Sequence, residues 1–140
     1  MKKISNGFDV FLQKAIKNQE TRRKPFILNL DGFGEVEFIR PSNEEILKYV
    51  DEISNAVVVI NDEATNTDMI KLHEASSKLV YVCCPYLQEK SLQESLSISN
   101  PFDTPSEVFG ATMVLDIASQ IMEKIEGKEI IEDINKKIKN

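Results

Sequence analysis

The sequence predicts a small α+β fold, mainly α-helical, with one N-terminal β-hairpin. Three observations support this prediction: apolar residues recur at three- and four-residue spacing, two β-rich runs flank a glycine-containing turn, and two helix-opening motifs are present. A chain of 140 residues fits one domain. We expect a single helical domain over residues 1–127, with the hairpin at about 26–39, and a short amphipathic C-terminal tail over 128–140.

The first predicted element is a short helix over residues 7–19. Its apolar residues, spaced three and four apart, are Phe8, Phe11, Leu12, Ala15 and Ile16. The residue before Pro25 avoids helical geometry, so the helix ends ahead of it. Residues 1–25 carry seven Lys or Arg against two acidic residues, whereas residues 26–127 carry six against eighteen. We expect this basic arm to lie on the acidic body, with contact to an acidic partner as the alternative.

Two β-rich runs, residues 26–30 and 35–39, predict the hairpin. Between them, Gly32 and Gly34 can adopt the positive φ that tight turns require. Alternation places apolar residues on one face of each run: Phe26, Leu28 and Leu30 on the first, Val36 and Phe38 on the second. Two strands alone are marginally stable, so this face needs a cover.

Two helices dominate the middle of the chain. Ser42 and Glu45 form a capping box, and the helix after it has an apolar stripe of Ile46, Leu47, Val50 and Ile53. Residues 61–67 are expected to be a polar loop. A longer helix is expected from Asp68 to about Cys84, with an apolar side of Met69, Leu72, Leu79, Val80 and Cys83. Residues 87–96 predict a short helix and residues 100–103 a turn.

The last long helix is predicted over residues 105–126. Thr104 is its expected cap, Pro105 its first residue, and Glu107 completes a capping box. Gly127 is its expected stop. Its apolar face consists of Val108, Ala111, Val114, Leu115, Ile117, Ala118, Ile121, Met122 and Ile125.

Two apolar residues of this helix, Phe109 and Met113, lie together on its polar side. They either pack under the hairpin or the N-terminal helix, or form a partner-binding spot, since aromatic residues and Met are enriched in interface cores. The tail over 128–140 adds a second candidate contact, an isoleucine stripe of Ile130, Ile131, Ile134 and Ile138. A helix of that length is marginal alone in water, so the tail must dock on something.

Composition excludes several classes of protein. No run of about 18 apolar residues is present, so we expect no membrane span and no membrane partner. The acidic body repels phosphate, which argues against nucleic-acid binding. The N-terminus lacks the apolar stretch of a secretory signal, and the adjacent Cys83 and Cys84 form no disulfide framework. We therefore expect an intracellular protein.

No catalytic, cofactor-binding or metal-binding residues are predicted. His73 is the only histidine, and the sequence has no Cys-x-x-Cys spacing. Cys83 and Cys84 therefore lack the nearby base that a nucleophile needs and the further ligands that a metal site needs. The cysteines are expected to be small core residues. We therefore expect a protein that is not an enzyme and that needs no cofactor.

The order of motifs resembles a known family. The motifs are the helix opening at residues 41–45, the Leu-Val-Tyr-Val-Cys-Cys-Pro-Tyr-Leu segment at 79–87, residues 92–95, and the opening at 104–107 that leads to Gly127. Together they resemble the XkdN-like tail assembly chaperones of long-tailed phages, prophages and phage-tail-like particles of Gram-positive bacteria. The resemblance covers most of residues 25–127. Ser106 stands where many members have a glycine beside the glutamate.

This resemblance implies a mostly helical chaperone without a cofactor. Such proteins bind and keep soluble the aggregation-prone tape measure protein before tail tube subunits polymerise around it, and they are absent from the finished particle. The partner implied here is therefore the tape measure protein, in the cytoplasm of the bacterial host, with the tail tube protein and a second copy of the chain as further candidates. The candidate contacts are Phe109, Met113 and the tail isoleucines. The alternative is an acidic inhibitor or immunity-type protein that binds a basic partner.

Overall fold

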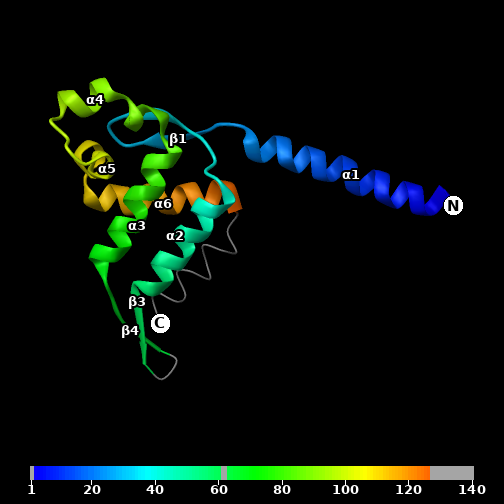
Figure 1. Cartoon of the computed structure of the whole chain (residues 1–140), viewed down its shortest axis with the longest axis horizontal. Helices are drawn as coiled ribbons and strands as arrows, with labels where there is room; N and C mark the ends of the chain where they lie inside the picture. Colours follow the sequence, from blue (N-terminus) through cyan, green and yellow to red (C-terminus); the bar gives the residue numbers. More distant parts are fainter. Residues whose placement is uncertain (1, 61–62, 127–140) are drawn as a thin grey trace.

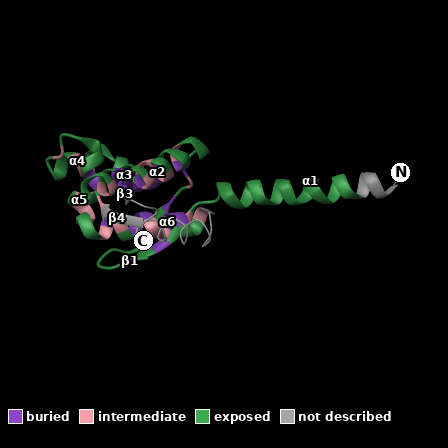
Figure 2. Cartoon of the chain, turned by 90° about the horizontal axis from the view of Figure 1, so that it is seen from below, coloured by how far each residue is buried: buried purple, intermediate pink, exposed green. Residues whose placement is uncertain are grey.

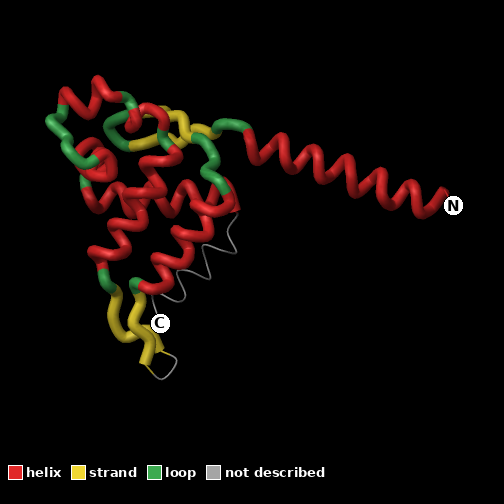
Figure 3. The backbone as a smooth tube through the Cα atoms, viewed as in Figure 1, coloured by secondary structure: helices red, strands yellow, loops and turns green. Residues whose placement is uncertain are grey.

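Helices predominate in the computed structural model of the chain, which describes residues 2–60 and 63–126, and two hairpins stand at opposite ends of the helical body (Figure 3). Figure 1 labels the elements, which in chain order are α1 (Lys2–Arg23), β1 (Phe26–Leu30), β2 (Gly34–Phe38), α2 (Asn43–Asn55), β3 (Val57–Ile60), β4 (Glu63–Thr67), α3 (Met69–Cys83), the 3-10 helix η1 (Pro85–Gln88), α4 (Lys90–Ser95), the 3-10 helix η2 (Pro101–Asp103), α5 (Thr104–Phe109) and α6 (Ala111–Glu126). The predicted α+β, mainly helical fold with an N-terminal hairpin is confirmed.

Helix α3 is the centre of the body, because it packs against both α2 and α6. Each of the three helices contributes fully buried apolar side chains, such as Ile53 of α2, Val80 of α3 and Ile117 of α6. Figure 2 shows the buried residues gathered where these helices meet. The driving force for this arrangement is the burial of one apolar stripe from each helix.

The hairpin of β1 and β2 covers one end of this core. Its strands pair antiparallel, with Phe26 opposite Phe38, and the predicted inner face is buried at Leu28, Leu30, Val36 and Phe38. Gly32 and Gly34 both have positive φ, as the turn requires. The Ile39 N–H donates to the Cys83 carbonyl at 2.7 Å, which joins the hairpin to the end of α3. The predicted hairpin is therefore confirmed, and its apolar face is covered by the helical core, as expected.

Helix α2 begins with the predicted capping box. The Ser42 hydroxyl accepts a hydrogen bond from the Glu45 N–H, and the Glu45 carboxylate accepts one from the Ser42 N–H, both at 3.1 Å. The predicted stripe is wrong at Leu47, which is 67% exposed, while Tyr49 is buried in its place. Position 49 lies three residues after Ile46 and four before Ile53, so a tyrosine there shares their face.

Helix α3 begins at Met69, one residue after the predicted start, and Asp68 is its N-cap, whose carboxylate accepts a hydrogen bond from the Lys71 N–H at 3.1 Å. It ends at Cys83, just before Pro85. Met69, placed on its apolar side by the sequence, is exposed, because the first turn of α3 extends past the core. The segment after it forms η1 and the six-residue α4, which is shorter than the helix predicted over 87–96.

The prediction of a polar loop over residues 61–67 is wrong for residues 63–67, which form strand β4. This strand pairs antiparallel with β3, with Val57 opposite Thr67 and an irregularity between Val58 and Val59. The β-branched run of residues 57–60 is a strand signal in its own right. Polar residues in β4 are compatible with a two-stranded ribbon that stands off the body, as Figure 1 shows.

The prediction of one unbroken helix over residues 105–126 is also wrong. Gly110, at φ 88° and ψ 149°, separates α5 from α6. Only glycine adopts this conformation readily. Thr104 does not cap: it is the first residue of α5, and its buried hydroxyl has no hydrogen-bond partner among the described residues.

Helix α1 is longer than the predicted helix over 7–19, and it does not lie on the body. Residues 7–25 are all exposed, and Figures 1 and 2 both show α1 pointing away from the remainder of the chain. The expectation that the basic arm lies on the acidic body is therefore wrong. The predicted tail over 128–140 lies outside the described residues.

Candidate partner-binding site

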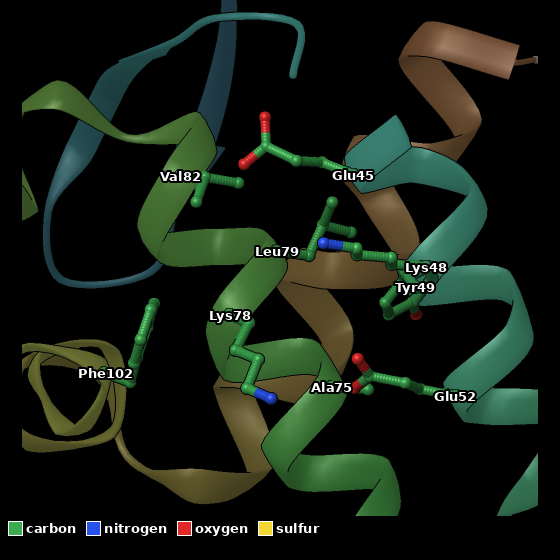
Figure 4. Close-up of a pocket in the computed structure, with 9 residues that line it drawn as sticks. All are labelled: Glu45, Lys48, Tyr49, Glu52, Ala75, Lys78, Leu79, Val82 and Phe102. Atoms are coloured by element: carbon green, nitrogen blue, oxygen red, sulfur yellow. The ribbon is translucent and has the colours of Figure 1, made fainter. Parts of the chain in front are cut away.

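A pocket of about 420 Å³ opens between α2 and α3, and we call it the α2–α3 pocket (Figure 4). Helix α2 contributes Tyr49 to its floor and Glu45, Lys48 and Glu52 to its rim. These residues recur at three- and four-residue spacing, so one face of α2 presents them all. Phe102 of η2 stands at the far edge of the pocket.

Helix α3 supplies the opposite wall of the α2–α3 pocket. Its residues Ala75, Leu79 and Val82 are apolar, and Lys78 stands among them at the rim. Ala75 and Leu79 are buried and Val82 is half-buried, so the floor is continuous with the core. The volume falls within the range of about 300–1,000 Å³ that is usual for ligand pockets. The lining is mainly apolar, which suits apolar side chains rather than a charged ligand.

Phe102 is held at the edge of the pocket by an aromatic contact. Its ring meets Tyr81 edge to face, with ring centroids 5.3 Å apart and planes at 73°. Phe102 remains 42% exposed, so a large apolar surface is left facing the opening. Burial raises the pKa of Tyr49, and its hydrogen bond with the Ser76 side chain only partly offsets that rise. The floor of the pocket is therefore uncharged at neutral pH.

The wall formed by α2 is acidic. This helix carries Glu44, Glu45, Asp51 and Glu52 against the single base Lys48. Lys48 lies 3.5 Å from the Glu44 carboxylate, and both side chains are well exposed, so the pair contributes little to stability. The rim of the pocket itself combines Glu45 and Glu52 with Lys48 and Lys78, so it matches a partner whose apolar side chains are flanked by charges of both signs.

Helix α1 carries a second apolar surface, which we call the α1 stripe: Phe8, Phe11, Leu12 and Ile16. At 100° per residue these side chains fall within about 140° of one another. Phe8 is 61% exposed and Phe11 67%, which is unusual for large aromatic side chains. Nothing in the described part of the chain covers this stripe.

Basic residues cluster where the C-terminal end of α1 meets the body. Arg22 and Arg23 face Arg40 across one hollow, and Lys124 of α6 lines a neighbouring one. The Arg40 guanidinium donates hydrogen bonds to the Ile125 carbonyl at 2.9 Å and to the Asn43 amide oxygen at 3.1 Å. The first of these bonds satisfies a carbonyl in the last turn of α6.

The structure places two of the six candidate contact residues. Phe109 ends α5 and Met113 lies in α6, so Gly110 separates them into different helices. Both are half-buried and pack against the core, and the Phe109 ring meets Phe33 of the β1–β2 turn edge to face at 4.9 Å. Packing at the hairpin is one of the two alternatives that the sequence leaves open. Ile130, Ile131, Ile134 and Ile138 lie outside the described residues.

The two cysteines, the histidine and the serine nearest it are buried or half-buried. Cys83 and Cys84 are free and fully buried, and burial is the main reason that the pKa of each thiol is raised. The Ser77 hydroxyl lies 3.4 Å from His73 Nε2, but Ser77 is buried in the core, away from the pocket lining. No three His, Cys, Asp or Glu side chains within residues 2–60 and 63–126 gather closely enough to hold a metal ion.

Sequence reasoning found neither the α2–α3 pocket nor the exposure of the α1 stripe. The pocket depends on how α2 and α3 pack, and no local pattern encodes that geometry. The stripe was visible as a helical face, but its spacing alone cannot distinguish a core face from a free one. None of the helices in the part of the chain that the structure describes combines the length and the apolar character that a membrane crossing requires. No family model, no curated protein and no solved structure matches this chain.

Proposed function

We propose that this protein is a non-catalytic assembly chaperone that holds an apolar helix of its client in the α2–α3 pocket. The observation that carries the proposal is an apolar floor, open to solvent, between two helices and bordered by charged residues. Laying an amphipathic helix into an apolar groove is a recurrent mode of peptide recognition. A pocket of this kind binds side chains without needing any reactive group.

The proposed client is the tape measure protein of a phage or phage-like tail. The support for this identity is the sequence resemblance over residues 25–127, above all residues 82–87 and 104–107. In this proposal the chaperone acts in the cytoplasm of the bacterial host and leaves before the particle is complete. The tail tube protein is a second candidate partner.

The charge of the chain supports the same role. A net charge of −6 keeps a complex soluble while apolar surfaces are covered, because like-charged complexes repel one another. The acidic wall of α2 borders the pocket, so charge lies next to the surface where an apolar client would bind. An amphipathic client helix would bury its apolar face and leave its polar face to water.

Co-expression with the tape measure protein encoded nearby tests the proposal. The unmodified chain is expected to keep that protein soluble, and the variant Val82→Gln/Phe102→Gln is expected to leave most of it in the pellet. Leu47→Gln is the matched control, because Leu47 is an exposed apolar residue of α2 that does not line the pocket. Equal solubility of the client with and without this chain would contradict the proposed function.

The predicted tail contact needs its own variant. Changing Ile130, Ile134 and Ile138 to Ser is expected to weaken client rescue with little change in the melting temperature. A large drop in melting temperature would instead make the tail part of the folded core.

A further inference from the structure

The α1 stripe needs a partner. Helix α1 is 22 residues long, about 33 Å, and residues 7–23 gain nothing from packing against the body. A helix without tertiary packing is marginal in water, because packing of an amphipathic face supplies most helical stability in proteins. An exposed stripe of two phenylalanines, a leucine and an isoleucine on such a helix marks an interaction surface.

We propose that the α1 stripe of one copy docks in the α2–α3 pocket of a second copy. Recognition of a helix by a groove uses anchors at i, i+3, i+4 and i+7 or i+8, and the stripe has this spacing from Phe8 to Ile16. The stripe extends over about 12 Å, and the α2 side of the pocket rim, from Glu45 to Glu52, over about 10 Å, at 1.5 Å per residue. The two surfaces therefore match in length.

Charge complementarity selects this occupant. Helix α1 carries six Lys or Arg against two acidic residues, whereas residues 26–127 carry eighteen acidic residues against six Lys or Arg. On the helical wheel Arg22 and Arg23 fall within the arc of the stripe, about two turns beyond Ile16, so both face the same partner as the stripe. Docking with the stripe over the pocket brings them toward one end of the rim, where Glu52 attracts them and favours one register.

The same charges disfavour other occupants. Two α1 helices paired through their stripes would bring two basic helices together, and like charges at an interface are costly. Folding of α1 into the pocket of its own chain would leave a monomer, which the experiment below distinguishes. The proposal does not depend on any client, because self-association is measured on this chain alone.

The test uses the full chain and two complementary variants. The first, Phe8→Gln/Phe11→Gln/Leu12→Gln, changes only exposed residues of α1 and keeps good helix formers. The second, Val82→Gln/Phe102→Gln, changes the pocket. Leu47→Gln is again the matched control. Molar mass is measured by light scattering from low micromolar to near-millimolar concentration, with thermal unfolding to check that each variant folds.

We expect the unmodified chain and the control to self-associate, and each of the two variants to be monomeric. A mixture of the two variants is expected to form a complex with one copy of each, because one supplies an intact pocket and the other an intact stripe. A monomeric unmodified chain, a self-associating α1 variant, or a mixture that stays monomeric would each overturn the proposal.

Exchanging the charges of the two surfaces tests which residues meet in the proposed complex. Arg22→Glu/Arg23→Glu is expected to weaken self-association at least tenfold, and mixing it with Glu52→Arg, which leaves the α2 capping box intact, is expected to restore a mixed complex. Failure of the exchange to restore association would contradict the proposed contact between these residues. The chaperone assay gives a separate outcome, since loss of self-association through α1 leaves the pocket intact for a client.

Discussion

Cys83 and Cys84 lie side by side at the end of α3, where both thiols are buried. Burial raises the pKa of both, and for Cys83 the nearby Glu45 carboxylate raises it further. Neutral thiols are poor nucleophiles, so these residues act as core side chains. The Cys83 carbonyl accepts the hydrogen bond from the Ile39 N–H, and this bond joins the end of α3 to the hairpin.

The buried thiols make stability depend on pH. Because the pKa of each thiol is higher in the folded state than in the unfolded state, stability is fully present below the unfolded pKa of about 8.5 and is lost as the pH rises above it. Urea unfolding at pH 7 and pH 9.5 is expected to show a lower midpoint at the higher pH. Cys83→Ala/Cys84→Ala is expected to lower stability at pH 7 by a few kcal/mol, from lost packing, and to flatten the pH dependence.

Thiol labelling provides the control for this prediction. A maleimide reagent is expected to react slowly with the folded chain and to label both cysteines in urea. Rapid labelling of the folded protein, or a stability that rises between pH 7 and pH 9.5, would contradict the assignment of these thiols as buried and neutral.

At the level of single elements, the first hairpin and the start of α2 follow local sequence signals. The β1–β2 hairpin and the capping box of Ser42 and Glu45 were predictable, because each depends on residues within a few positions of one another, whereas the capping box predicted at Thr104 and Glu107 is absent. Gly110 was missed because the apolar spacing continues across it from Val108 to Val114. Glycine inside a helix costs only about 1 kcal/mol, so its presence alone did not indicate a break.

The candidate site was less predictable than the fold. The pocket residue Phe102 follows a proline in a predicted turn, and only packing of η2 against α3 brings it to Leu79. Phe109 was recognised as an apolar residue out of place, but its partner Phe33 lies far away in the sequence. Contacts between distant segments depend on the whole chain, which a single sequence does not reveal.

Gly110→Ala tests the break between α5 and α6. An alanine at φ 88° is strained even though its Cβ would meet no atom within 4 Å, so unfolding free energy is expected to fall by about 1–3 kcal/mol. Gly7→Ala in α1 is the matched control and is expected to increase helicity, since Gly7 has a helical backbone with open space around it. Urea unfolding followed by circular dichroism measures both. Unchanged or higher stability of Gly110→Ala would contradict the strained conformation.

On the scale of the whole molecule, charge and apolar surface are divided between two parts. The basic helix α1 presents the stripe, and the acidic body presents the α2–α3 pocket. Under the two proposals, the pocket has two occupants: α1 of a second copy and an amphipathic helix of the client. Both occupants offer the same chemistry, an apolar helical face, so their binding is mutually exclusive.

If both proposals hold, α1 of a second copy and a client helix compete for the α2–α3 pocket. If α1 of a second copy fills about nine-tenths of the pockets, the apparent affinity for a client helix falls about tenfold, because only free pockets bind. The variant Phe8→Gln/Phe11→Gln/Leu12→Gln is expected to bind a labelled tape measure fragment more tightly than the unmodified chain, and Leu47→Gln to bind it equally. Fluorescence anisotropy measures the affinities, and light scattering is expected to show the self-associated chain dissociating into complexes of one chaperone with the fragment. Equal affinity of the α1 variant and the unmodified chain, with undiminished self-association at saturating fragment, would place the client on a different surface from α1.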